Sequence, residues 1–280
     1  MQKLCGHTSA KHLLEKISQE VADITCEIER APGFAIIQVG ANPASDLYIT
    51  NKKKVANNLG INVQHHQFDV SATFEEVGKL IGDLNMDRDI DGIIVQLPLP
   101  HHLKQVLYLI SPLKDVDGLG YIQQARLALN IPGLRPCTPM GVMAMLEYYG
   151  IDIECNVCIV GRSVLVGQSL ALMMMHKNAT VDVVHAKTRD IKEHLIRADI
   201  VCLCAGHPGL VNFDMLKDDA IVIDIAITKN DQNKVVGDLE LTGSTEIKAY
   251  SPVPGGVGPM TVASLMQNVV NACKTNHKLM

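Results

Sequence analysis

The sequence has no long apolar run, no low-complexity tract, no repeat at a fixed period and no linker rich in proline, glycine or serine. No apolar stretch approaches the ~20 residues that a membrane-spanning helix needs, and residues 1–17 become charged too soon for a secretory signal. The net charge of −5 gives no reason to expect a nucleic-acid or membrane partner. We therefore expect a folded cytoplasmic protein.

Eight cysteines are present, but they are scattered through 280 residues rather than concentrated in a small disulfide scaffold. Reduced thiols are the simpler interpretation. Cys155 and Cys158 form a CxxC pair with no second pair nearby, whereas structural zinc sites usually have four ligands. The histidines show no HExxH pattern, and His65-His66 and His101-His102 are expected at the surface. We expect no metal site.

Segments typical of strands alternate with segments typical of helices, which favours parallel sheets covered by helices. The composition, 47% hydrophobic and 20% charged, and the length suit two folded domains. In the first half the pattern predicts helices over 10–29, 45–59 and 73–85, and strands over 33–40, 61–69 and 92–96.

The pattern restarts after Thr138-Pro139. The second series comprises a helix over 140–149, strands over 156–160, 179–184, 199–204 and 220–225, and a final helix over 261–274. We predict an α/β protein of two domains: an N-terminal α/β catalytic domain, residues 1–139, and a Rossmann-type dinucleotide-binding domain with a parallel sheet, residues 140–260. The C-terminal helix, within 261–280, is expected to pack back on the first domain.

A candidate phosphate-binding turn follows the strand over 156–160. It runs from Gly161 through Arg162 and Ser163 to Gly167, and a helix is predicted after it. Glycine lets the backbone approach a phosphate, and a helix N-terminus offers free N–H groups. The spacing G-x5-G differs from G-x-G-x-x-G, so an ordinary tight turn would also explain this segment.

The next strand indicates which cofactor would bind. An NAD site usually has an acidic residue near the end of that strand, but here the strand ends in His185-Ala186-Lys187-Thr188. Arg162 could instead bind a 2′-phosphate through paired donors. The sequence therefore favours NADP over NAD, and NAD is not excluded.

Four further segments complete a recognisable set: PASDLYITNKKK (43–54), VQLPLP (95–100), KDVDG (114–118) with PCTPMG (136–141), and PVPGGVGPMT (252–261). Together with the GRSVLVG turn, they resemble the bifunctional methylenetetrahydrofolate dehydrogenase/cyclohydrolase family along nearly the whole chain. The resemblance implies oxidation of methylenetetrahydrofolate with NADP and hydrolysis of the methenyl product to 10-formyltetrahydrofolate, a step of one-carbon metabolism that serves purine biosynthesis. It also implies a homodimer.

The resemblance implies roles for the polar residues. Lys52 would handle the proton in the hydrolysis, Gln96 would hydrogen-bond Lys52, Tyr48 would orient the folate, and Asp117 would hold its pterin end. Tyr48 and Lys52 share a face if their segment is helical. Asp115 is assigned mainly to turn structure.

Further contacts follow from the same resemblance. Substrate would also touch Pro98, and Pro254 and Gly255 would lie between folate and nicotinamide on a rigid loop. The expected cofactor contacts lie in the glycine turn and in the late loops: Gly161, Arg162, Ser163, Gly167, Ile227, Gly256 and Thr261.

This chain departs from the family pattern mainly around the cofactor. The departures are Gln123, Ala125, Ser169, Ala186 and Ala226. Loss of a hydroxyl at Ala186 would remove one hydrogen bond, worth ~0.5–1.5 kcal/mol. Two alternatives stay open: a cyclohydrolase-only or non-catalytic folate- or nucleotide-binding relative with the same fold, and a two-domain dehydrogenase of the shikimate or amino-acid type.

Overall fold

The computed structural model describes residues 1–279, which form two compact units. Unit 1 comprises residues 1–11 and 138–261, and unit 2 comprises residues 12–137 and 262–279. Their boundaries fall in or beside helices α1 (Gly6–Ile28), α5 (Cys137–Tyr148) and α8 (Val257–His277). The expected α/β class with two parallel sheets is confirmed.

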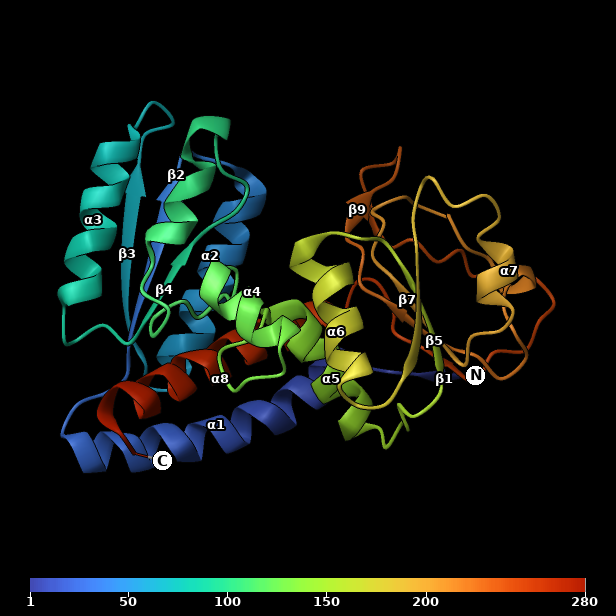
Figure 1. Ribbon diagram of the computed structural model, residues 1–280, viewed down its shortest axis with the longest axis horizontal. Helices are drawn as coiled ribbons and strands as arrows, with labels where there is room; N and C mark the ends of the chain where they lie inside the picture. The colour runs from blue at the N-terminus through green and yellow to red at the C-terminus, as the bar shows by residue number, and fades with distance from the viewer. Residues whose placement is uncertain (280) are drawn as a thin grey trace. The chain divides into compact units, whose positions relative to one another are not determined.

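Unit 2 is built on a three-stranded parallel sheet with the order β3-β2-β4 (Figure 1). Its strands are β2 (Gly33–Val39), β3 (Asn62–Phe68) and β4 (Gly92–Val95). Successive side chains of a strand point to opposite faces. Phe34 and Ile36 accordingly join a core cluster with α1 and α8, while Ala35 and Ile37 join a second cluster with α3. Burial on both faces explains why this strand is a continuous apolar run.

The helices of unit 2 include α2 (Pro43–Asn58), α3 (Phe74–Met86), the 3-10 segment η1 (His101–Leu109) and α4 (Tyr121–Ala128). A capping box between Thr73 and Glu76 fixes the start of α3. The sequence predicted α2 and α3 but neither η1 nor α4. Only Gln123 and Leu127 are buried in α4, so that helix has almost no apolar stripe from which to predict it.

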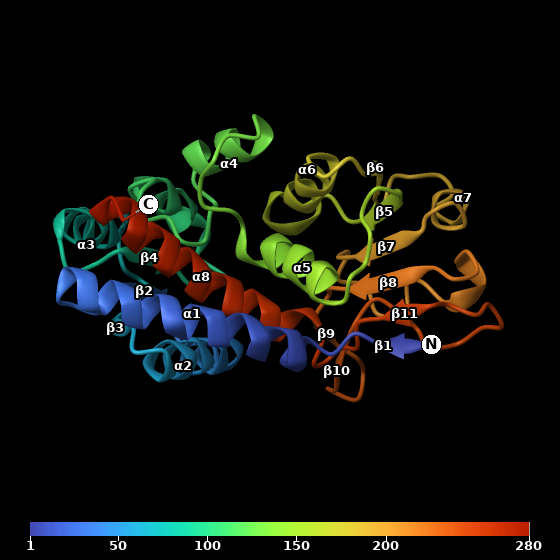
Figure 2. The same ribbon diagram turned by 90° about the horizontal axis from the view of Figure 1, so that it is seen from below.

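Unit 1 contains a six-stranded parallel sheet with the order β1-β11-β8-β7-β5-β6 (Figure 2). The four predicted strands are present as β5 (Asn156–Val160), β6 (Thr180–Val184), β7 (Ile200–Leu203) and β8 (Ile221–Asp224). The two edge strands, β1 (Gln2–Lys3) and β11 (Ala249–Tyr250), were not predicted. Two residues are too few to establish an alternating pattern.

The strand β1 changes where the first residues of the chain belong. We expected residues 1–139 in the N-terminal domain, but Gln2 and Lys3 pair in parallel with Ala249 and Tyr250. Residues 1–11 therefore lie in unit 1. The remaining elements of unit 1 are short: η2 (Val164–Gln168), α6 (Ser169–Met175), α7 (Lys192–Leu195), η3 (Phe213–Met215), β9 (Thr228–Lys229) and β10 (Val235–Val236).

Candidate active site

A lysine and a glutamine meet at the carboxyl end of the unit 2 sheet. Lys52 lies on α2, and Gln96 directly follows the last residue of β4. The Lys52 Nζ donates a hydrogen bond of 2.9 Å to Gln96 Oε1. The Gln96 Nε2 donates to the Leu97 carbonyl at 2.7 Å, which holds the amide with its oxygen toward the lysine. The structure therefore brings together a primary amine and a neutral amide, as the sequence predicted.

Tyr48 lies one turn before Lys52 on α2, so the two residues share a face of this helix. The residue is 38% exposed, and the partial burial of its hydroxyl raises the tyrosine pKa. Its ring is thus available as a flat apolar surface beside the lysine. Such a surface suits an aromatic ligand.

Asp117 is a carboxylate that lies near enough to Lys52 to be influenced by its charge. Burial raises the Asp117 pKa, while the nearby Lys52 charge and a hydrogen bond from the Cys137 thiol lower it. Burial raises the Cys137 pKa well above its ordinary value, so this thiol keeps its proton and can donate. Sequence reasoning missed Cys137 as a partner of Asp117, although it lies in the PCTPMG segment.

Asp115 has the structural role that the sequence assigned to it. Its carboxylate accepts hydrogen bonds from the backbone N–H groups of Gly118 at 3.1 Å and Gly120 at 2.7 Å. Burial raises its pKa to about 6. Gly118 has a φ of +69°, and a methyl group there would lie 2.5 Å from the Arg135 carbonyl carbon. The turn thus presents Asp117 at a fixed place.

A cavity of about 840 Å³ opens where the three strands of unit 2 end. The predicted substrate contact Pro98 lines it, together with the Gly40–Asn42 loop and Asp69. The carboxyl ends of parallel strands are where ligands usually bind in α/β folds. Pro98 is two residues from Gln96 in the chain, but neither Lys52 nor Gln96 lines this cavity.

The glycine turn of unit 1 is tightly closed. Gly161 has a φ of +132°, and a methyl group at Gly167 would lie 2.1 Å from the Gly161 carbonyl oxygen. The Ser163 hydroxyl accepts a hydrogen bond from the Val166 N–H at 3.2 Å. Arg162 and Ser163 are exposed. The turn therefore carries an exposed guanidinium and an exposed serine between two glycines.

Two of the departures can be placed around this turn. Ser169 is fully buried, and its hydroxyl donates to the Val164 carbonyl at 2.6 Å, which stabilises the turn without a proline. Ala186 is exposed directly after β6, and no carboxylate lies among residues 185–189. The segment after β6 accordingly offers no carboxylate for a ribose hydroxyl within residues 185–189.

The PVPGGVGPMT segment starts as a loop with a cis peptide bond between Val253 and Pro254. Gly255 has a φ of +98°, and its carbonyl accepts a hydrogen bond from the Gly6 N–H at 2.8 Å. The side chains of Thr261 and Thr138 are hydrogen-bonded at 3.2 Å. A methyl group at Gly256 would lie 2.5 Å from the Pro252 oxygen. The segment is therefore held by the start of α1, by Thr138 and by close backbone packing at Gly256.

The remaining predicted residues divide between the units. Ile227 is 50% exposed and follows the buried Ala226. Gln123 is buried in α4, where its Nε2 donates to the Pro112 carbonyl at 2.5 Å, and Ala125 is exposed on the same helix. Gln123 and Ala125 support a local turn and contribute no group to the Lys52 site.

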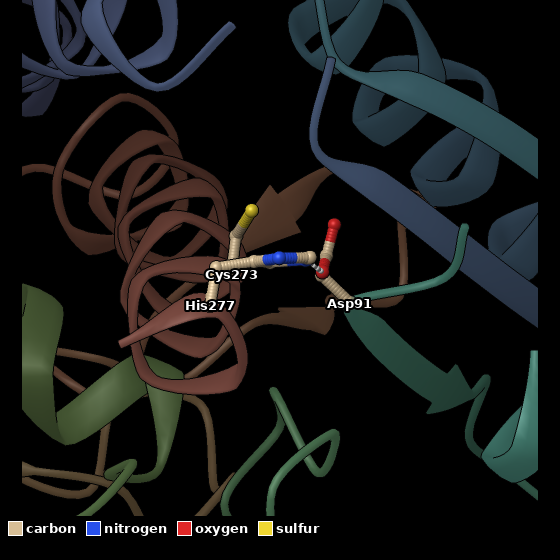
Figure 3. A group of neighbouring side chains, drawn as sticks. All are labelled: Asp91, Cys273 and His277. Carbon is tan, nitrogen blue, oxygen red and sulfur yellow. Dashed lines mark ion pairs between the residues drawn. The ribbon is translucent and has the colours of Figure 1, made fainter. Parts of the chain in front are cut away.

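One group outside this site has the residue types of a metal centre. Asp91, Cys273 and His277 each place a ligand atom within 4.8 Å of the others (Figure 3). However, Arg30 donates to both Asp91 oxygens, at 2.8 and 2.9 Å, and its Nη2 lies 2.7 Å from His277 Nε2. Burial and Asp91 raise the Cys273 pKa to about 12. The guanidinium of Arg30 already neutralises this carboxylate, so the group resembles a buried ion pair more than a metal site.

Among residues 1–279, no helix has the length and apolar character needed to cross a membrane.

Two family models match the chain. The catalytic-domain model of tetrahydrofolate dehydrogenase/cyclohydrolase matches residues 4–117, and the NAD(P)-binding-domain model of the same family matches residues 136–277. A curated relative, the bifunctional protein FolD of Nitratiruptor sp., is 42% identical over 278 residues, which are 98% of each chain.

Solved structures are similar over the same extent. The bifunctional FolD enzyme methylenetetrahydrofolate dehydrogenase/cyclohydrolase from Campylobacter jejuni has a TM-score of 0.95 at 37% identity, covering 98% of this chain and 99% of its own. The Trypanosoma brucei dehydrogenase-cyclohydrolase, solved with NADP and an inhibitor, has a TM-score of 0.92 at 31% identity and covers 98% and 97%.

Proposed function

Because the chain belongs to the tetrahydrofolate dehydrogenase/cyclohydrolase family, we propose that it oxidises 5,10-methylenetetrahydrofolate to 5,10-methenyltetrahydrofolate with NADP. The same chain then hydrolyses the methenyl product to 10-formyltetrahydrofolate. The observation that carries this proposal is the hydrogen bond between Lys52 Nζ and Gln96 Oε1.

In the hydrolytic step, water attacks the methenyl cation and must lose a proton as it does so. Lys52 is the group that removes this proton, in the manner of a general base. Gln96 holds the lysine in place and adds no charge of its own, unlike a carboxylate, which would favour the ammonium form. Its own amide is fixed by Leu97.

The folate is bound by the groups around this pair. Asp117 accepts N–H hydrogen bonds from the pterin end, and Tyr48 and Pro98 contact the rings. Pro254 and Gly255 add backbone contacts from their loop. The turn held by Asp115 keeps Asp117 in position.

The residues of unit 1 fit a nicotinamide dinucleotide. The closed turn from Gly161 to Gly167 would hold the diphosphate, Arg162 the 2′-phosphate and Ser163 a neighbouring oxygen. Ile227, Gly256 and Thr261 would contact the rest of the molecule. Bound NADP supplies the hydride acceptor, and the chain contributes the binding and alignment of the two rings.

We further infer that the protein is a cytoplasmic homodimer with contacts through unit 1, and that its product serves one-carbon metabolism and purine biosynthesis. Both inferences rest on the family. Light scattering of the purified protein should give about twice the mass of one 30.5 kDa chain. A mass equal to one chain would contradict the dimer.

A cyclohydrolase without dehydrogenase activity is the second candidate. The observation that favours it is that Ser169, Ala186 and Ala226, three of the five departures, lie around the predicted cofactor site, whereas Tyr48, Lys52, Gln96 and Asp117 match the family. It predicts hydrolysis of added methenyltetrahydrofolate without reduction of either nucleotide.

One spectrophotometric assay separates these candidates. Methylenetetrahydrofolate is supplied with NADP or with NAD, and reduced nucleotide and methenyltetrahydrofolate are followed together. We expect reduction of NADP and a transient of methenyltetrahydrofolate. Reduction of NAD alone would overturn the cofactor assignment, and hydrolysis without any reduction would leave the second candidate.

A further inference from the structure

Two buried carboxylates lie in unit 1 outside the predicted binding residues. Asp224 is 3% exposed and Asp238 is fully buried. Neither forms an ion pair with a lysine or arginine within residues 1–279. A buried charge is costly unless hydrogen bonds replace the water that it lost. The hydrogen-bond partners of these two carboxylates therefore show which segments of the chain each carboxylate fixes in place.

Asp238 holds the loop that follows β7. Its carboxylate accepts hydrogen bonds from three consecutive backbone N–H groups, those of Ala205 at 2.7 Å, Gly206 at 3.0 Å and His207 at 2.5 Å. Three donors on one carboxylate fix both the path and the direction of the loop.

Asp224, the last residue of β8, holds the next loop. Its carboxylate accepts from the N–H groups of Ala226 and Asp238, both at 3.2 Å, and of Leu239 at 2.9 Å. A methyl group at Gly237 would lie 2.0 Å from this carboxylate, so glycine is needed there. The Asp224 N–H also donates to the Ser251 hydroxyl at 2.8 Å.

The segments joined by these bonds carry the predicted cofactor contacts. Cys204 directly precedes the loop held by Asp238. It lies close to Gly161, because a methyl group at Gly161 would be only 2.7 Å from the Cys204 carbonyl oxygen. Ala226 precedes Ile227. Ser251 precedes the loop with Gly255 and Gly256. The network thus connects the glycine turn, the loop after β8 and the PVPGG loop.

We propose that Asp224 and Asp238 are positioning residues of the cofactor site. They align the loop after β7, the loop after β8 and the PVPGG loop at the carboxyl end of the unit 1 sheet for a nicotinamide dinucleotide. The proposal rests on the proposed function. It goes beyond it by assigning the alignment of these loops to two carboxylates that do not themselves face the cofactor.

An amide tests this role because it replaces one accepting oxygen by a donor of nearly equal size. In Asp238→Asn, an NH2 group would face a backbone N–H group, and the loop would have to move. We expect the Kd for NADP to rise roughly 10- to 100-fold, as for the loss of a hydrogen bond to a charged group. The KM for methenyltetrahydrofolate in the cofactor-free hydrolysis should stay unchanged.

The matched control is Asp199→Asn. Asp199 also accepts a backbone N–H, that of Asn156 at 3.0 Å, and it lies in the same unit just before β7, at the amino end of the strands. It should lower thermal stability without raising the Kd for NADP. If Asp238→Asn does not fold, Ser251→Ala loosens Asp224 without changing charge. It should raise the Kd roughly 2- to 10-fold.

NADP binding by the full-length chain is measured by titration, alongside hydrolysis of methenyltetrahydrofolate without cofactor. Unchanged NADP binding in Asp238→Asn or, if that variant does not fold, in Ser251→Ala overturns the proposal and leaves the proposed function intact. An equal loss of hydrolysis and NADP binding also overturns it, since the role would then be general stability. Failure of the unaltered chain to bind NADP overturns the proposal and the dehydrogenase together.

Discussion

The predicted sites of the two units consist of different kinds of groups, side chains in unit 2 and mostly backbone in unit 1. In unit 2 the groups that we propose to react are side chains, with a direct hydrogen bond between Lys52 and Gln96 and with Asp117 near the lysine charge. In unit 1 the predicted cofactor contacts are mostly backbone groups in loops that contain glycine. Asp224 and Asp238 fix the neighbouring loops through hydrogen bonds to backbone N–H groups. A site of side chains depends on residue identity, whereas a site of backbone depends on loop shape. This difference explains why unit 1 can lack the family serine at Ala186 and still keep the form of the site.

The largest expected effect is on the hydrolysis rate and comes from the side chains of unit 2. Lys52→Met should lower the cyclohydrolase rate by at least roughly 100-fold, the usual contribution of a general base. The Kd for NADP should stay unchanged because the glycine turn lies in unit 1. Hydrolysis of methenyltetrahydrofolate and an NADP titration measure the two effects.

Lys54→Met is the matched control for this variant. Lys54 is an exposed lysine on the same helix, two residues further along. It should hydrolyse methenyltetrahydrofolate at the unaltered rate. A Lys52→Met protein with the full rate would remove the lysine from the mechanism, and a similar loss in both variants would indicate a general effect of charge.

A second prediction compares the buried carboxyls of the two units. Burial raises the pKa of both Asp115 and Asp224 to about 6, from an ordinary value of 3.8. Because the folded state binds these protons more tightly, the resulting stability is fully present below pH 3.8 and is lost as the pH rises through about 6. Relative to Asp115→Asn, the unaltered protein should therefore lose about 2 kcal/mol between pH 4 and 7.

Asp224→Asn should give a similar slope, and urea unfolding of the three proteins at several pH values measures both slopes. Equal slopes mean that each unit carries one such carboxyl. A slope in one variant only would assign the pH dependence to a single unit. Stability curves that run parallel at every pH would contradict both pKa shifts.

The smallest expected effect is on the Kd for NADP and comes from the predicted cofactor site of unit 1. Ala186→Ser would restore a hydroxyl at the end of β6, and one added hydrogen bond should lower the Kd for NADP roughly 2- to 10-fold. The Kd for NAD should not change, because NAD has no 2′-phosphate. Ala179→Ser, just before the start of β6, is the matched control. Equal gains for NADP and NAD would place the new hydroxyl elsewhere.

Sequence patterns sufficed for the groups that lie near one another through regular structure. Tyr48 and Lys52 are four residues apart on a helix, and Gln96 follows a buried strand, so periodicity predicted the element on which each one lies. That Gln96 hydrogen-bonds Lys52 was implied by the family resemblance. The turn role of Asp115 was also expected, since aspartate side chains commonly hydrogen-bond backbone N–H groups in turns.

The contacts that were missed join distant segments. Asp238 binds residues 205–207, and Asp224 binds Leu239, but no periodic pattern relates these positions. The strands β1 and β11 are set by pairing and not by their own two residues. A single sequence shows propensity and spacing, whereas these contacts depend on the loops that the completed sheet brings together.

The arrangement of α8 has a consequence for synthesis of the protein. Leu265, Met266 and Val269 share one core cluster with Ile17 and Phe34. The ribosome adds the former group some 230 residues after the latter at a pace of ~5–20 residues per second. The apolar surface of unit 2 therefore stays incomplete while residues 138–261 of unit 1 are translated. A nascent chain arrested before residue 262 would expose the Ile17 and Phe34 surface and become a substrate for chaperones.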